Sequence, residues 1–270
     1  MTPDETSAAG AQDERAEKPV FDPDQLALIP ETDRRWSWVE IDLSAIRHNV
    51  GVARSLIKPS TRLLAVVKSD AYGHGAVRVA KTALQSGANY LAVATVDEGI
   101  KLREGMVGAP IVLLSEPPAT AAPLLLAYKI MPSIYTPEFA IAYAEKADEY
   151  GIRAPFHLAV NTGMNRIGVR YDNVVDFMRK VSFHRALDLV GTFTHFATAD
   201  CEGTLDFGIQ VKRFTEAISA LRELRCDGSL SAGPLRHGAV GRVALWSAHL
   251  PGDALDDQPQ ARDERPCAHH

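Results

Sequence analysis

The stretch Leu63-Leu-Ala-Val-Val-Lys68-Ser-Asp-Ala-Tyr72-Gly-His-Gly75 decides the fold. It begins with a continuous apolar run, Leu63–Val67, which is typical of a parallel strand buried on both faces. The run ends at Lys68, and Gly73 and Gly75 then allow the backbone to turn tightly. A strand that passes through a short turn into a helix is the repeating unit of α/β folds.

The same unit recurs along the chain at intervals of about 20–30 residues, which predicts a parallel sheet with right-handed crossovers. About six such units lie between Leu63 and Arg225, whereas a closed (β/α)8 TIM-type barrel has eight units in about 250 residues. We therefore expect an α/β protein with an incomplete TIM-type barrel. Strands are expected at 38–43, 63–67, 90–94, 111–114, 130–134, 155–160 and 187–194, and helices at 44–57 (with Ser44 as N-cap), 76–85, 97–103, 119–127, 137–149, 172–181 and 207–225.

The two ends of the sequence differ from this pattern. Residues 1–35 are acidic and have no sustained apolar period, so they are expected to form a disordered acidic leader. The barrel is assigned to 36–226. After Asp227 the rhythm is lost, and the tail 227–270 is expected to be atypical and poorly ordered, with one further strand possible at 240–246.

Composition excludes several classes of function. The formal net charge is −5, which gives no basic surface for nucleic acid. No apolar run approaches the length of a membrane span. The three cysteines form no CxxC pair, which favours a reducing cytoplasm. Cys267 with His269 and His270 is the nearest approach to a metal-binding cluster, but its polar, terminal position favours an unstructured tail, and we expect no metal.

The first candidate for chemistry is Lys68. A lysine at the carboxyl end of a buried barrel strand points to the mouth, where barrel enzymes keep their active sites. Desolvation there lowers the pKa of an amine and makes it a nucleophile that can form a Schiff base with an aldehyde. The alternative from the residues alone is an exposed lysine followed by a glycine turn.

Two further segments follow predicted strands. Met164-Asn-Arg166-Ile-Gly168 offers Arg166 for bidentate contact with a carboxylate, although an ordinary loop with a surface arginine has the same pattern. His195 ends the strand expected at 187–194, where a packed core histidine is the alternative to a base or ligand.

Together these segments resemble the alanine racemases, which are fold-type III enzymes that use pyridoxal 5′-phosphate. The resemblance rests on Ala65–Gly75, on Met164–Gly168, and on Thr194-His-Phe196 with Ala199-Asp200, all in the order and spacing of the family. Glu40 through Asn49 is similar to the family's opening segment. The resemblance extends over about residues 36–226.

The resemblance implies a role for five positions. Lys68 is expected to hold the cofactor as a Schiff base and to act as a base on one face of the substrate Cα. Tyr72 is expected to bond the cofactor phosphate, and His195 to lie against the pyridine ring. Arg166 is expected to bond the phenolic oxygen and to orient the substrate carboxylate, while the backbone at Met164 lines the substrate site. The implied activity is the interconversion of L- and D-alanine, which supplies a peptidoglycan precursor.

The sequence departs from the family pattern in two places. Ala159 occupies a position where many members have a carbamylated lysine that supports the arginine. Downstream, the phosphate-binding Asn-Ser pair, the arginine on the pyridine nitrogen and the β-rich C-terminal domain with its opposite-face tyrosine are missing, and Leu250 stands near the expected arginine. We therefore expect a chain truncated or frame-shifted after about residue 227, with impaired racemisation. The family's homodimer is then also not expected to be complete in this chain.

Two alternatives to a racemase follow from these departures. One is a non-catalytic protein that binds pyridoxal phosphate and serves its homeostasis, as single-domain relatives of this barrel are thought to do. The other is a relic that binds no cofactor. An amino-acid decarboxylase on the same barrel is a more distant enzyme alternative.

Overall fold

The computed structural model describes residue 30 and residues 37–199, 205–226 and 244–246. The chain divides into two units, residues 1–41 and 42–270. In the first unit the described residues carry no helix or strand. The second unit contains every element named below.

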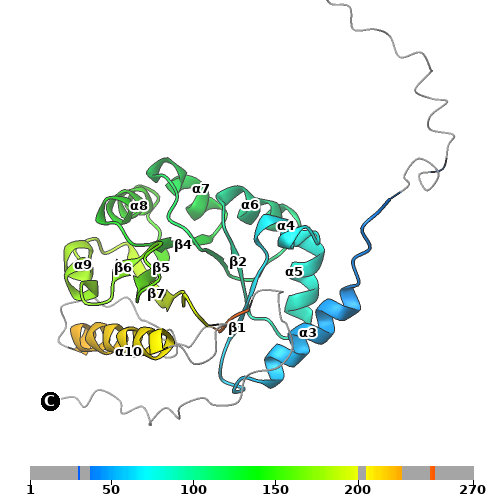
Figure 1. The fold of residues 1–270 in the computed structure, drawn as a ribbon. Coiled ribbons are helices and arrows are strands. Elements are labelled where there is room, and N and C mark those ends of the chain that lie inside the picture. The colour runs from blue at the N-terminus through cyan, green and yellow to red at the C-terminus, as the bar shows by residue number, and fades with distance from the viewer. Residues whose placement is uncertain (1–29, 31–36, 200–204, 227–243, 247–270) are drawn as a thin grey trace, which may run out of the picture. The chain divides into compact units, whose positions relative to one another are not determined.

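The second unit is built on one parallel sheet of eight strands (Figure 1). Its order is β6-β5-β4-β3-β2-β1-β8, and β7 also pairs with β5. The strands are β1 (Leu63–Val66), β2 (Tyr90–Val93), β3 (Ile111–Leu113), β4 (Ile130–Ile134), β5 (Ala154–Asn161), β6 (Val169–Arg170), β7 (Leu187–Thr194) and β8 (Ala244–Trp246).

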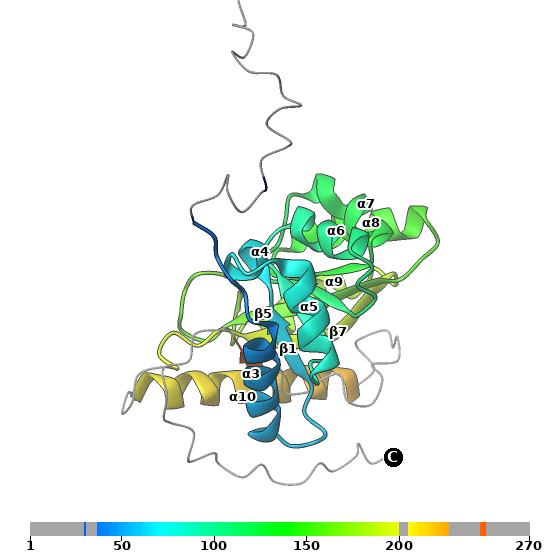
Figure 2. The ribbon, with the colours of Figure 1, turned by 90° about the vertical axis from the view of Figure 1, so that its right-hand side faces the viewer.

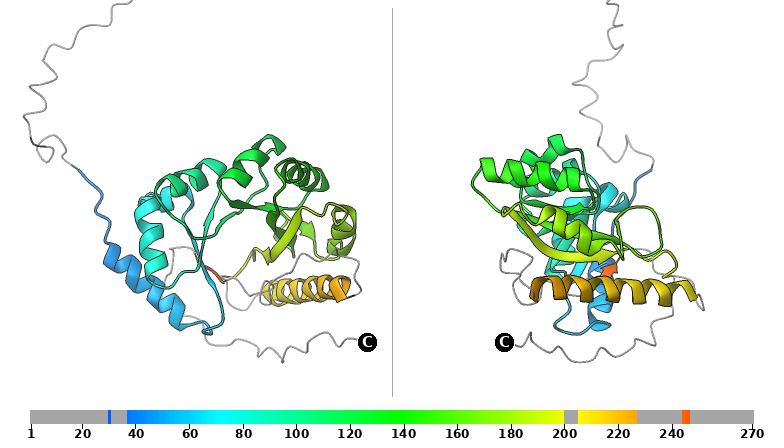
Figure 3. Two further views of the ribbon diagram at one scale, coloured as in Figure 1. Left: turned by 180° about the vertical axis from the view of Figure 1, so that it is seen from behind. Right: turned by 90° about the vertical axis from the view of Figure 1, so that its left-hand side faces the viewer.

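Helices connect most of the successive strands and lie on the outer side of the curved sheet (Figure 1), whereas a loop joins β5 to β6. They are α3 (Leu43–Ser55), α4 (Lys68–Tyr72), α5 (Ala76–Gln85), α6 (Val96–Glu104), α7 (Ala122–Ala127) after the 3-10 turn η1 (Ala119–Ala121), α8 (Pro137–Glu149), α9 (Val174–Val181) and α10 (Leu205–Cys226). Helix α3 packs beside α5 (Figure 2), and α10 packs against α9 (Figure 3).

Both faces of the sheet are buried, which explains the continuous apolar runs of its strands. The outer face contributes Leu91, Ile111 and Phe156 to the main core with the helices, each with no exposed surface. On the inner face Leu64 and Val112 form a smaller cluster with Ala92.

The sheet is a partial barrel, as the sequence predicted. In the part of the chain that the structure describes, β8 pairs with β1 and β7 with β5, and no ladder joins β7 to β8. Strand β8 falls within the strand considered possible at 240–246. The expected leader, the rest of the tail and the cysteine and histidines near the C-terminus lie outside the described residues. No helix among the described residues is long and apolar enough to cross a membrane.

Two local predictions are wrong. The described residues of 38–43 do not form a strand, because no neighbouring chain pairs with their backbone groups and alternation alone supplies no ladder. The N-cap of α3 is Asp42 rather than Ser44, since its carboxylate accepts from the N–H groups of Ser44 and Ala45. A carboxylate, which also accepts from the Ser44 hydroxyl, is the stronger cap at a positive helix end. The short strand β6 was not predicted.

Candidate active site

Lys68 is separated from β1 by a single residue and lies at the start of a left-handed turn. Ser69, Asp70, Ala71 and Tyr72 have φ values of 52, 54, 54 and 56°. Non-glycine residues in this region cost about 1–2 kcal/mol each. Sequence reasoning placed the tight turn at Gly73 and Gly75, which do have positive φ values, but it missed the four residues before them.

Hydrogen bonds hold this turn in place. The N–H of Ala71 donates to the carbonyl of Val67 at 2.9 Å, and the N–H of Gly75 donates to the carbonyl of Asp70 at 2.9 Å. The Asp70 carboxylate accepts from the N–H of Ala76 at 3.0 Å, at the start of α5. As a result the half-buried Lys68 and Tyr72 lie on the same side, with the Lys68 Nζ atom 6.0 Å from the centre of the Tyr72 ring.

The loop after β5 carries Met164 and Arg166. The side-chain oxygen of Asn161 accepts from the N–H groups of Gly163 and Asn165, at 3.0 and 3.1 Å. This Asx-type bonding turns the chain back on itself. Gly168 ends the loop at φ 108°, where a Cβ atom would lie 2.7 Å from the backbone nitrogen of Asn161.

Helix α10 supports this loop and the segment after β7. Arg213 donates to the carbonyl of Thr162 at 2.9 Å, and its guanidinium lies over the Tyr171 ring. The buried side chain of Gln210 accepts from the N–H of Ala197, two residues beyond His195. One helix thus fixes the two segments that carry Arg166 and His195.

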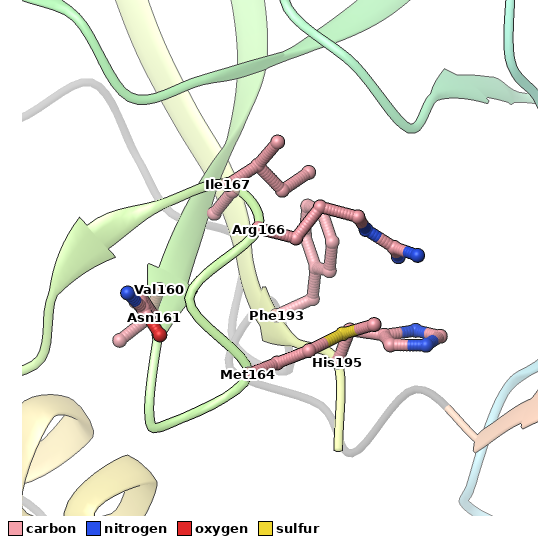
Figure 4. A pocket seen from close by; sticks show the side chains of 8 residues that line it. Val160, Asn161, Met164, Arg166, Ile167, Phe193 and His195 are labelled. Atoms are coloured by element: carbon pink, nitrogen blue, oxygen red, sulfur yellow. The ribbon is translucent and has the colours of Figure 1, made fainter. Parts of the chain in front are cut away.

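A pocket opens between these two segments (Figure 4). In Figure 4, Arg166 and His195 project to the same side, and the Met164 side chain extends toward His195, while Asn161 lies on the other side of the loop. Three of the five predicted residues are therefore brought together. The pocket is lined by Ala159, Val160, Asn161, Met164, Arg166, Ile167, Phe193 and His195.

Lys68 and Tyr72 do not line that pocket. Tyr72 borders a second hollow between α3, β1 and α5, where partial burial raises the pKa of its hydroxyl. Lys68 is nonetheless close enough to act on His195. The pKa of His195 lies below its ordinary value of 6.5, first because of desolvation and then because of the positive charges of Arg166 and Lys68.

The side chains of Lys68, Arg166 and His195 are suited to an anionic ligand. Within the described residues, neither Lys68 nor Arg166 forms an ion pair or a hydrogen bond to a carboxylate. An amine, a guanidinium and an imidazole without a counter-ion fit a group that carries phosphate, phenolate and aldehyde functions, and pyridoxal 5′-phosphate carries all three. The residues present thus fit this cofactor.

Ala159 lines the same pocket as Arg166. It is buried in β5. A methyl group cannot accept a hydrogen bond, so the arginine gains no support from this position. The sequence alone identified this departure.

Sequence reasoning missed the residues that position the site. Asn161 could have been found from its place two residues before Gly163, because asparagine in such a turn accepts hydrogen bonds from the backbone that follows it. Arg213 and Gln210 give no local signal, since they lie far along the chain from the segments they hold.

Known proteins match this chain over its barrel. The family described as "Alanine racemase, N-terminal domain" matches residues 41–244. An alanine racemase of Synechocystis sp. is 43% identical over 243 residues, covering 84% of this chain and 65% of that protein. An alanine racemase of Nostoc sp. is 40% identical over 194 residues, which cover 70% of this chain and 50% of the Nostoc protein.

Solved structures of alanine racemases also match this chain over about 70% of its length. Alanine racemase of Clostridium difficile 630 superposes with a TM-score of 0.67 at 34% identity, over 70% of this chain and 50% of that chain. An alanine racemase of Bacillus anthracis, solved with bound L-Ala-P, gives a TM-score of 0.65 at 36% identity, over 69% of this chain and 48% of that chain.

The chain spans between half and two thirds of the length of these two curated relatives. The family match ends at residue 244, so the C-terminal domain of the family is not covered. The partial barrel, the order of the three segments and these matches agree: the chain belongs to the alanine racemase family and corresponds to its N-terminal barrel domain.

Proposed function

We propose that this chain is the cofactor-binding barrel of an alanine racemase, which interconverts L- and D-alanine with pyridoxal 5′-phosphate. The observation that carries the proposal is that Arg166 and His195, from two strand ends, project to the same side of one pocket, where neither pairs with a carboxylate of the described residues (Figure 4). These two basic groups suit an anionic cofactor, and the Lys68 amine at a third strand end suits the cofactor's aldehyde.

Each side chain has a distinct task in this proposal. Lys68 holds the cofactor through its amine, and Tyr72 donates to the phosphate. Arg166 bonds the phenolic oxygen and orients the substrate carboxylate. His195 is held neutral by its lowered pKa and can lie against the pyridine ring without adding charge. The backbone at Met164 lines the substrate site.

The chemistry is a proton transfer at the substrate Cα. When bound, pyridoxal 5′-phosphate supplies the conjugated system that makes the Cα–H acidic. Once the amine of alanine has taken its place on the cofactor, the freed Lys68 amine would take the proton on one face and could return it to that same face. The sequence has seven tyrosines, all between Tyr72 and Tyr171 on the barrel. The opposite-face tyrosine of the family's C-terminal domain is therefore not among them, and full inversion requires a group from outside this sequence.

The experiment follows the α-hydrogen of alanine in heavy water. The 270-residue chain, loaded with pyridoxal 5′-phosphate, is incubated separately with L- and D-alanine, and deuterium at Cα and the enantiomeric ratio are measured by NMR and chiral chromatography. We expect exchange in one enantiomer to exceed inversion by about a hundredfold or more, because a missing acid–base group costs that much. Lys68→Ala should abolish exchange.

Other outcomes contradict the proposal in distinct ways. A cofactor adduct on Lys68 with no exchange in either enantiomer would make the chain a non-catalytic pyridoxal phosphate protein. No adduct after borohydride reduction would exclude both functions. We place the protein in the cytoplasm, as its cysteine usage suggests, and expect the family's dimer only where the C-terminal domain is present.

A further inference from the structure

Helix α6 holds the backbone directly beside Lys68. One oxygen of Glu98, in the first turn of α6, accepts from the N–H of Ser69 at 2.6 Å. Its other oxygen accepts from the N–H of Ala94 at 2.8 Å and from that of Thr95 at 3.2 Å. A single carboxylate therefore connects the residue after Lys68 to the end of β2.

This connection lies where the strand ladder stops. The N–H of Val67 donates to the carbonyl of Ala92 at 2.9 Å, and this is the bond between β1 and β2 that immediately precedes Lys68. The paired register of the two strands ends at Val66 and Ala92, and the Glu98 carboxylate then bridges Ser69 and Ala94. The backbone of Lys68 is thus fixed on both sides.

Ser69 is also the first residue of the left-handed turn. Its φ of 52° is uncommon for serine, so the turn needs interactions that hold it. A bond from a charged oxygen is stronger than one from a neutral acceptor. If that bond is lost, Ser69 is free to return to an ordinary conformation, and the direction of Lys68 changes with it.

A second contact from α6 reaches the same turn. Lys101 pairs with Asp70 at 2.8 Å, but both side chains are about half exposed, at 58% and 48%. Exposed ion pairs are weakened by solvent and salt. Glu98 is less exposed than Ser69, Asp70 or Lys101, and it makes three bonds to backbone groups. It is therefore the stronger of the two anchors.

We propose that Glu98 is a positioning residue that directs the Lys68 amine toward Arg166 and His195. It touches neither substrate nor cofactor, and acts through the Ser69 N–H on the backbone that carries the lysine. The proposal rests on the proposed function, because the direction of the Lys68 amine matters only if that amine binds the cofactor.

The test compares Glu98→Ala and Glu98→Gln with Glu104→Ala in the full 270-residue chain. Glu104 ends the same helix, carries the same charge and is exposed, and its side chain makes no hydrogen bond to the described residues. The Gln variant keeps the size of the side chain but turns an amide NH2 toward backbone donors, so it remains informative if the Ala variant folds poorly.

Two readouts are taken for each variant. Amide hydrogen exchange at Ser69, without cofactor, should become at least tenfold faster in both Glu98 variants and stay unchanged in Glu104→Ala. The rate constant for condensation of pyridoxal 5′-phosphate with Lys68, per folded molecule and across a pH series, should fall about 10–100-fold, because a displacement of about 1 Å can cost that much. Borohydride reduction and peptide mapping identify the modified lysine.

The outcomes separate the two proposals. A wild-type chain that gives no adduct on Lys68 rejects the proposed function. A wild-type adduct with an unchanged rate constant and pH profile in both Glu98 variants overturns the role of Glu98 alone. A lower amount of folded protein with an unchanged rate per folded molecule also overturns it, because it shows a purely structural role.

Discussion

The hydroxyl groups of Thr162 and Thr194 lie 2.8 Å apart and form a buried hydrogen bond. Thr162 begins the loop that carries Met164 and Arg166, and Thr194 precedes His195. The two residues are far apart in sequence and belong to different strand ends. This bond therefore joins the two segments of the candidate active site without touching either functional side chain.

We expect Thr162→Val and Thr194→Val each to lower the free energy of unfolding by about 1–3 kcal/mol, because each leaves a buried hydroxyl without its partner. The double variant should lose less than the sum of the single losses, since two valines need no hydrogen bond. Urea unfolding of the four proteins measures this coupling. Additive losses would show that the hydroxyls do not interact.

His157 should make the stability of the barrel depend on pH. It is buried in β5, and desolvation lowers its pKa from 6.5 to about 4. The unfolded chain therefore binds more protons than the folded chain between these values. The contribution of neutral His157 to the free energy of unfolding is therefore fully present above pH 6.5. It is lost as the pH drops to 4, which lowers the free energy of unfolding by up to about 3 kcal/mol.

Urea unfolding at several pH values between 4 and 8, for wild type and His157→Leu, tests this prediction. The leucine variant should show a flatter dependence, because it has no proton to bind at this position. Equal slopes in the two proteins would mean that His157 is not held neutral.

Removing the charge of Arg166 should raise the pKa of His195. Desolvation is the largest cause of its lowered pKa. The positive charge of Arg166 lowers the pKa more than that of Lys68 does. Arg166→Ala should therefore shift the NMR titration of the His195 ring toward its ordinary value while leaving it below 6.5. Arg170→Ala is the control, since this exposed arginine pairs with Asp172. A shift of equal size in both variants would indicate only a change in net charge.

Gly168→Ala should disrupt the Arg166 loop. The backbone there has a φ of 108°, and an added Cβ atom would meet the nitrogen of Asn161 at 2.7 Å and the carbonyl carbon of Val160 at 2.9 Å. We expect a loss of more than about 1 kcal/mol in the free energy of unfolding. Cofactor condensation and α-hydrogen exchange should weaken as well, because Arg166 moves with the loop.

Gly51→Ala provides the matched control for this change. Gly51 lies within helix α3, and no atom of a neighbouring described residue lies within 4 Å of an added Cβ atom. Alanine there should raise the free energy of unfolding by about 0.5–1 kcal/mol and leave exchange unaltered. Thermal unfolding of both variants gives the comparison, and a stable, fully active Gly168→Ala would refute the argument.

Most of the barrel could be read from the sequence because its signals are local. The helix Pro137–Glu149 and the strands Ile130–Ile134 and Leu187–Thr194 have the boundaries that were predicted. Apolar period, a proline at a first turn and the length of an apolar run act within a few residues. The prediction over 38–43 was wrong because a strand needs a partner, which alternation cannot supply.

The candidate site was predicted only in part. Lys68, Arg166 and His195 stood out as residue types at strand ends, and the resemblance added Tyr72 and Met164. The residues that hold them did not stand out. Glu98 reads as an ordinary helix-start carboxylate, and Arg213 as a surface cation on a long helix, until the fold places them against Ser69 and Thr162.

The sequence by itself determined the repeating strand–helix order, the family and the chemical groups at the strand ends, because each depends on residue type and short-range spacing. The tertiary structure alone decided which distant backbone groups meet. It set the left-handed turn beside Lys68, the bridge from Glu98, and the bond between Thr162 and Thr194. Hydrogen bonds act only across a few ångströms, so contacts between residues far apart in the chain exist only once the strands have been brought side by side.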